Sequence, residues 1–361
     1  MKSLAQLGNE LYFGRKSFNI VGNRRRWLTI GLVFIVLSIG VLLVRGLNPG
    51  VEFSGGSEFR IEQAATTDSA PAIEVLANAG VSETPRVSVI GDDSLRVQTS
   101  QLTSEEIESI RSALAEAYGS EQISSTFIGP AWGQDVTQKA LMGMGIFLVL
   151  VAVVMALYFR TWTMSLAAIT GLIHDLIITV GVYALVGFEV TPASVIGFLT
   201  ILGYSLYDTV VVFDKVRENT ANALEQNRVT YAEGANLAVN QTIVRSINTS
   251  VVGVLPVGAI LFVGTTGLGA GTLRDISLAL FVGMIISTIS SIFIATPIEV
   301  AFRERTAAYA EHTKAVLAKR SVSEDLVAVD ATSAAILGTS VAPGGHQGQS
   351  AQPRKKPRKE R

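Results

Sequence analysis

The hydrophobic positions of the chain fall into six long apolar runs separated by polar segments. Each run is close to the 20 residues that an α-helix needs to cross about 30 Å of hydrocarbon. In chain order the runs cover residues 27–44, 140–159, 164–186, 192–213, 247–263 and 276–297. The pattern therefore predicts a multi-span α-helical membrane protein with six transmembrane helices.

The segment between the first two runs, residues 46–136, has the length and patterning of one small domain. Thr103 and Glu106 have the spacing of a capping box at the start of a helix. The segment's apolar positions predict, in order, a strand at 51–61 interrupted by Gly55-Gly56, a helix at 70–79, strands at 86–90 and 94–99, a helix after Thr103, and a strand at 122–128. The order β-α-β-β-α-β predicts an α+β ferredoxin-like domain.

Basic residues collect on one side of the predicted membrane. Residues 1–26 contain six basic residues and one acid, whereas residues 46–136 contain four basic and fourteen acidic ones. Cytoplasmic segments carry the excess of Lys and Arg, so both termini are predicted to be cytoplasmic and the domain extracytoplasmic. The expected organisation is a cytoplasmic segment 1–26, a helix 27–44, the extracytoplasmic domain 46–136, a five-helix bundle 140–297 with an inner loop 214–246, and a cytoplasmic tail 298–361.

The tail is rich in Ala, Ser, Gly and Val and is expected to be largely disordered from about residue 321. It ends in PRKKPRKER, which has six basic residues in nine. Two roles remain open for this basic end. It either contacts anionic lipid or ribosomal RNA, or remains a solvated tail that aids retention and orientation.

Composition excludes several classes of site. The chain has no cysteine, which rules out disulfides, thiolate metal sites and a cysteine nucleophile. Its three histidines are scattered, and no His-Glu-x-x-His motif occurs. The glycine-rich residues 264–271 are not followed by Gly-Lys-Ser/Thr, so they predict an outer loop and close helix packing instead of a phosphate loop. We expect no metal and no bound cofactor.

Asp208 lies inside the fourth apolar run. An aspartate near the middle of a spanning helix costs about 2.5–3.5 kcal/mol on insertion scales, so it needs a reason. At helical spacing Gly197, Thr200, Tyr204 and Asp208 share one face, which should lie against protein or a water-filled crevice. Two interpretations remain open: a hydrogen bond to a neighbouring helix, or a role in transport.

Two further features add candidate chemistry. The pair His174-Asp175 lies in the middle of the third run and is either a satisfied buried pair or part of a proton path, because imidazole titrates near neutral pH. Arg245 lies at the inner end of the fifth run and is either a headgroup anchor or a cation facing Asp208. In the second case the two groups are coupled, since desolvation raises the pKa of a carboxylate and an approaching guanidinium lowers it.

Three stretches together resemble one family. They are LNPGVEFSGGSEFRI after the first run, GYSLYDTVVVFDKVREN in the fourth and SSIFIATPIEV at the end of the sixth. They resemble SecF, within the SecD/SecF family of the resistance-nodulation-division superfamily, over about residues 11–305. The resemblance implies six spans with a ferredoxin-like domain between the first and second, in the bacterial cytoplasmic (inner) membrane.

The resemblance also implies a function. A SecF chain pairs with SecD beside the SecYEG channel, with YajC as a further candidate partner, and uses the proton gradient in place of a cofactor to help export an unfolded polypeptide. It is not an enzyme. The family's membrane aspartate and arginine fall on Asp208 and Arg245, which are implicated in proton passage. His174, Asp175 and Tyr204 are candidates to line the path, and Tyr207 stands where the family usually has asparagine.

Three competing functions remain. A proton-coupled exporter of small molecules or lipids in the same superfamily predicts two large outer domains and about twice the spans. An intramembrane aspartyl protease needs a second aspartate in a Gly-x-Gly-Asp setting, and no such motif occurs. A structural scaffold of the channel predicts that Asp208 and Arg245 matter only for assembly.

Overall fold

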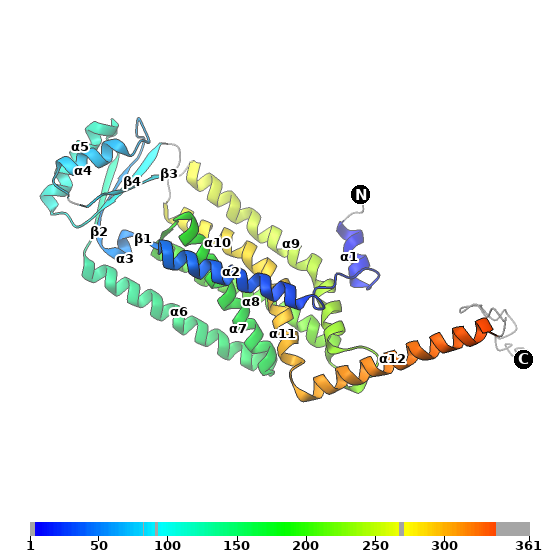
Figure 1. The fold of residues 1–361 in the computed structure, drawn as a ribbon. Helices are drawn as coiled ribbons and strands as arrows, with labels where there is room; N and C mark the ends of the chain where they lie inside the picture. The colour runs from blue at the N-terminus through cyan, green and yellow to red at the C-terminus, as the bar shows by residue number, and fades with distance from the viewer. Residues whose placement is uncertain (1–3, 82, 91–92, 267–270, 337–361) are drawn as a thin grey trace, which may run out of the picture.

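The computed structural model describes residues 4–81, 83–90, 93–266 and 271–336. It shows a bundle of long helices with a small α+β domain at one end (Figure 1). The first helix, α1 (Leu4–Tyr12), packs beside the start of a long helix, α9, at the other end of the bundle. The last helix, α12 (Ala307–Ile336), projects from that same end.

Six helices in the described residues are long and apolar enough to cross a membrane, which confirms the prediction of six spans. Five of them are α2 (Arg24–Arg45), α6 (Pro130–Phe159), α7 (Trp162–Val186), α8 (Pro192–Thr220) and α9 (Tyr231–Thr266). The sixth begins as α10 (Gly271–Ser290), passes through a π-helical turn (Ser291–Ala295) and ends as α11 (Thr296–Arg303). The chain is therefore a multi-pass membrane protein.

The centre of the bundle is formed by α7, α8 and the sixth span. These three bury close to half of their most apolar windows inside the protein, whereas α2 and α6 bury very little. On α2 and α6 the large apolar side chains point outward, as expected for helices that face lipid. Several polar side chains on the central helices, among them Asp175, Ser205 and Asp208, are consequently enclosed by protein.

The α+β domain has a four-stranded antiparallel sheet in the order β3-β4-β2-β5. Its strands are β2 (Gly56–Ile61), β3 (Arg86–Ile90), β4 (Ser94–Thr99) and β5 (Ile123–Ile128). Two helices, α4 (Ala70–Asn78) and α5 (Ser104–Tyr118), pack together on one face of the sheet (Figure 1). The element order β-α-β-β-α-β is the predicted one, and the capping box between Thr103 and Glu106 is present.

The core of this domain follows from the period-2 pattern of its strands. Alternate residues of β2 and β4 point toward the helices and are fully buried: Phe59, Ile61, Leu95 and Val97. Leu76 of α4 and Leu114 and Tyr118 of α5 meet them from the other side. The α+β domain thus has a hydrophobic core of its own.

The predicted first strand was wrong in its first half. Asn48–Pro49 forms the short strand β1, Val51–Ser54 forms the helical turn α3, and β2 begins only at Gly56. Gly55 and Gly56 have φ angles of 73° and 129°, which turn the chain sharply out of α3 and into β2. β1 instead pairs in parallel with β6 (Glu189–Val190), the short strand between α7 and α8.

Two segments predicted to lack regular structure are helical. The inner loop expected at 214–246 is mostly helix, because α8 continues to Thr220 and α9 begins at Tyr231. The tail expected to be disordered from about residue 321 remains in α12 to Ile336, in a stretch free of Pro and Gly. The apolar runs predicted where the chain leaves the membrane, but α8 and α9 continue as helices beyond those points. Residues 337–361, with the basic end, lie outside the described residues.

Candidate functional site

The carboxylate of Asp208 is enclosed between three helical segments. Its side chain is nearly inaccessible, with 4% of the residue exposed. The hydroxyl of Ser246 on α9 donates to Oδ1 at 2.8 Å, and the hydroxyl of Ser291 in the π-helical turn donates to Oδ2. Asp208 therefore joins α8 to both α9 and the sixth span.

The π-helical turn brings Ser291 to this position. Pro297 has no N–H, so the carbonyl four residues earlier cannot receive its usual helical hydrogen bond. The backbone widens over Ser291–Ala295, and the hydroxyl of Thr296 donates to the carbonyl of Ser291 at 3.2 Å. Turns of this kind recur at functional sites because they expose groups that a regular helix would hide.

A row of hydroxyls continues from Ser246 along α9. Ser250 donates to the carbonyl of Ser246 at 2.8 Å, and Thr288 of α10 donates to the hydroxyl of Ser250 at 2.6 Å. Tyr204 reaches the same serine at 3.5 Å. Of these residues only Tyr204 was predicted from the sequence. Ser246 and Ser250 could have been found from their spacing, since residues four apart share one face of a helix.

A second buried carboxylate lies one turn away along α8. Asp175 of α7 contacts Nδ1 of His174 at 3.0 Å through one oxygen and accepts a hydrogen bond from Ser205 at 2.7 Å through the other. His174 and Asp175 are 6% and 1% exposed. Ser205 lies three residues before Asp208 on α8. One helix therefore connects both carboxylates.

The structure does not bring Arg245 or Tyr207 into this site. Arg245 is exposed, and within the described ranges no hydrogen bond or ion pair joins it to Asp208. Successive helix residues point about 100° apart, so the turn that aims Ser246 at Asp208 aims Arg245 elsewhere. Tyr207 is 55% exposed for the same reason. The prediction that Arg245 faces Asp208 is not met in this arrangement of the helices.

The predicted polar stripe on α8 is also narrower than expected. Thr200 is exposed, and its hydroxyl donates to the carbonyl of Ile196 in the same helix. Gly197 lies buried against Ala279 of α10 and serves close packing. No group of three or more metal-ligating side chains occurs among the residues described.

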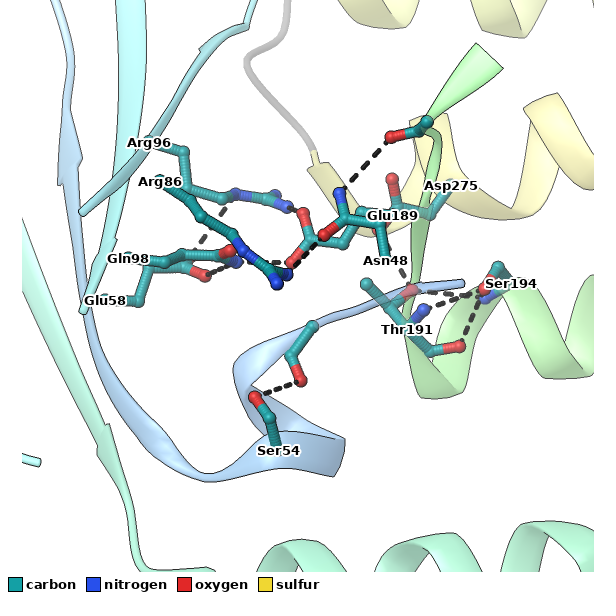
Figure 2. A network of polar contacts seen from close by, with 12 residues as sticks. Asn48, Ser54, Glu58, Arg86, Arg96, Gln98, Glu189, Thr191, Ser194 and Asp275 are labelled. Atoms are coloured by element: carbon teal, nitrogen blue, oxygen red, sulfur yellow. Dashed lines mark hydrogen bonds and ion pairs between the residues drawn. The ribbon is translucent and has the colours of Figure 1, made fainter. Parts of the chain in front are cut away.

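A second polar cluster lies where the α+β domain meets the bundle, and we call it the junction: Asn48, Glu58, Arg96, Gln98 and Glu189 (Figure 2). Arg96 of β4 forms ion pairs with Glu58 of β2, at 3.4 Å, and with Glu189 of β6. Gln98 donates to the carboxylates of the same two glutamates. Asn48 of β1 accepts from Arg86 at 2.6 Å and donates to the carbonyl of Gly187 at 3.2 Å.

The junction leads directly into α8. Thr191 follows β6 and caps α8 in a capping box with Ser194. Its hydroxyl also donates to Asp275 of α10 at 3.0 Å (Figure 2). Glu189 thus lies two residues before the cap of the helix that carries Asp208.

Glu52 of α3 brings a third carboxyl group close to the junction. Burial, together with the carboxylates of Glu58 and Glu189, raises the pKa of Glu52 above its ordinary value. A Cβ atom added to Gly50 would lie 2.5 Å from Oε2 of Glu52 and 2.9 Å from Oε1 of Glu189. A side chain at position 50 would require these two carboxyl groups to move apart.

Glu52→Gln is expected to stabilise the protein at neutral pH. Because the pKa of Glu52 is raised on folding, the folded state binds its proton more readily, and stability falls as the pH rises from the ordinary value of 4.5 through the raised one. Glutamine removes that loss. Thermal unfolding of the full chain should show a higher midpoint for Glu52→Gln at pH 7 and no difference at pH 4. An equal change at both values would contradict the assignment.

Comparison with known proteins agrees with this architecture. The family described as protein export membrane protein SecD/SecF, C-terminal, matches residues 109–305, and the SecD/SecF GG motif matches residues 40–62. A protein translocase subunit SecF from Streptomyces coelicolor is 46% identical over 89% of this chain and 86% of its own length. A subunit of the same name from Mycobacterium tuberculosis is 42% identical over 90% and 76%.

A solved structure is similar as well. The crystal structure of SecDF from Thermus thermophilus, described as a translocon-associated membrane protein, has a TM-score of 0.71 and 30% identity. The match covers 80% of this chain and 39% of that one, in which the SecD and SecF parts form a single chain. These relatives are named as translocase subunits and not as enzymes. The chain therefore belongs to the SecF branch of the SecD/SecF family of protein-export membrane proteins, as an auxiliary subunit of Sec-dependent export.

Proposed function

We propose that Asp208 binds and releases the proton through which this subunit uses the proton motive force to promote translocation. One observation carries the proposal: a carboxyl group lies buried within an apolar span with two serine hydroxyls in contact with it, and no ion pair to it is found in the part of the chain that the structure describes. An ionised group in such a place is costly and is rarely kept without a functional reason. No cofactor beyond the gradient and no enzymatic chemistry is required.

The hydrogen bonds to Asp208 depend on whether its carboxyl group is protonated. An ionised Asp208 only accepts, so Ser246 and Ser291 both donate to it. A protonated Asp208 must donate one hydrogen bond, so one serine has to turn its hydroxyl or lose the contact. Protonation thereby changes the link between α8 and either α9 or the π-helical turn. A small difference of this kind is sufficient to shift a population between two arrangements of helices.

Arg245 is proposed to respond to that change. It precedes Ser246 on α9, so a rotation of α9 by about 100° would exchange a hydroxyl for a guanidinium beside Asp208. His174 and Asp175 are proposed to support the path from α7 through Ser205, and Tyr204 through Ser250 of α9. Tyr207 is exposed, so we propose that its side chain contacts a neighbouring protein or lipid surface and does not line the proton path.

Arg245→Gln is expected to remove most of the gradient-dependent stimulation of export, whereas Arg245→Lys should retain a measurable part of it, because a positive charge remains. The comparison is made in membrane vesicles with and without an imposed proton gradient. Equal activity of the two variants would show that Arg245 does not act through its charge.

The proposed partners follow from the family. The fused SecDF relative supports SecD as the partner, and we propose that the pair works beside SecYEG, with YajC as an accessory, on an unfolded polypeptide. The charge asymmetry favours cytoplasmic termini and an extracytoplasmic α+β domain in the bacterial inner membrane. The basic end is proposed to contact anionic lipid. Purification of the complex followed by export with and without a gradient tests the assignment, and stimulation that is independent of the gradient would refute it.

A further inference from the structure

We propose that the Arg96–Glu189 ion pair is the link that transmits movement of α8 to the α+β domain. The inference rests on the proposed function of Asp208 and extends it to a second pair of residues, which act by positioning the domain. It starts from the places where the α+β domain and the bundle touch through side chains.

Arg96 and Glu189 belong to the two different parts of the protein. Arg96 lies on β4, in the middle of the sheet, and Glu189 lies on β6, between α7 and α8 (Figure 2). Their side chains are 11% and 13% exposed, so water screens the pair only weakly. A charged pair in this setting also has a defined geometry, because guanidinium groups hold carboxylates in a fixed orientation.

The attachment is stiff on both sides. Within the domain, Arg96 is also paired with Glu58, and Gln98 holds both glutamates, so Arg96 cannot easily follow Glu189 without moving the sheet. On the other side, a single residue separates Glu189 from the cap of α8 at Thr191. A displacement of the first turn of α8 therefore pulls directly on the sheet.

The ion pair between Arg96 and Glu189 depends on the number of carboxylates around Arg96. Arg96 is in contact with two carboxylates, and Glu52 lies close to one of them across Gly50. If Glu189 leaves, Arg96 keeps Glu58 and the domain stays intact. If Arg96 is removed, Glu58 and Glu189 both lose their ion-pair partner. Substitution of Glu189 should therefore leave the domain intact, whereas substitution of Arg96 should also disturb the contacts inside the domain.

Glu189→Ala is the sharper test, because it breaks the link and leaves the ion pair inside the domain. Gradient-stimulated export should fall by roughly tenfold, within the range typical of energetic coupling between two sites. Arg96→Gln should show at least the same loss. The matched control is Glu108→Gln, which removes an exposed ion pair with Arg111 on α5 and should export normally.

A distance measurement separates a coupling role from a purely structural one. The chain contains no cysteine, so Ser109→Cys on α5 and Leu157→Cys at the far end of α6, both exposed, provide two unique sites for spin labels. In the full chain with its partner subunit, Asp208→Asn should shift the distance between the labels, because asparagine mimics the uncharged carboxyl. With Glu189→Ala present as well, the same substitution should leave the distance unchanged.

The possible outcomes are distinct. A shift that survives Glu189→Ala would overturn the link while leaving the proposed function of Asp208 intact. Absence of any shift in the parent protein, together with normal gradient-driven export by Asp208→Asn, would overturn both. Loss of the shift only when Glu189 is replaced supports the link.

Discussion

Asp208→Asn is expected to export protein at the rate measured without a gradient, whether or not a gradient is present. Asparagine keeps the size of aspartate and can still accept a hydrogen bond from Ser246 or Ser291, but it cannot bind or release a proton. The cost to folding should therefore be small, on the order of 1 kcal/mol for one altered hydrogen bond. Export into membrane vesicles with and without a proton gradient provides the measurement.

A matched control lies on the same helix. Asp214 is six residues further along α8, is partly exposed and accepts a hydrogen bond from Tyr158 at 2.7 Å. Asp214→Asn makes the same chemical change outside the buried cluster and should keep full stimulation by the gradient. Equal losses in both variants would indicate that α8 tolerates no loss of a carboxylate, and would remove the case for Asp208 as the proton site.

Gly56→Ala is expected to prevent the α+β domain from folding normally. Gly56 has a φ angle of 129°, and a Cβ atom there would lie 2.4 Å from the carbonyl oxygen of Thr99, on the neighbouring strand β4. Neither the turn nor the strand pair can adapt without breaking backbone hydrogen bonds. We expect a loss of about 3 kcal/mol or more in the free energy of unfolding.

Gly80→Ala distinguishes the two causes of that loss. Gly80 also has a positive φ, 81°, but a Cβ atom there would meet nothing within 4 Å. It should cost only about 1–2 kcal/mol, the strain of a left-handed residue with a side chain. The thermal unfolding midpoint and the cleavage of residues 56–128 by added protease measure both variants. Similar losses in the two would show that the contact with Thr99 is not decisive.

The fold was largely predictable because membrane helices and a small sheet both leave strong hydrophobic patterns. The six spans and strands β3 and β4 follow directly from apolar periods of the chain. The predicted strand at 51–61 was wrong in its first half because alternating apolar residues there belong to a helical turn. Val51 and Phe53 alternate like a strand, yet they lie in α3, because the positive φ angles of Gly55 and Gly56 separate them from β2.

The site was predictable only at its ionisable centre. Asp208, His174 and Asp175 stand out because charge is rare inside a membrane. Ser246 and Ser291 do not stand out, since hydroxyls are common in spans and their partner is distant in sequence. The orientation of Arg245 was also beyond the sequence, because it depends on the rotation of α9. Glu189 and Arg96 are 93 residues apart, and no local pattern connects them.

The most direct test of the central claim is proton movement measured during export. Vesicles containing the SecD-paired complex and the translocation channel, with an acidic lumen on the extracytoplasmic side, are loaded with a pH-sensitive dye, and proton release from the lumen is recorded while a polypeptide is translocated inward. We predict proton release that accompanies translocation in the parent protein and is absent with Asp208→Asn, while Asp214→Asn behaves like the parent. Proton release that continues during translocation with Asp208→Asn would contradict the claim that Asp208 carries the proton.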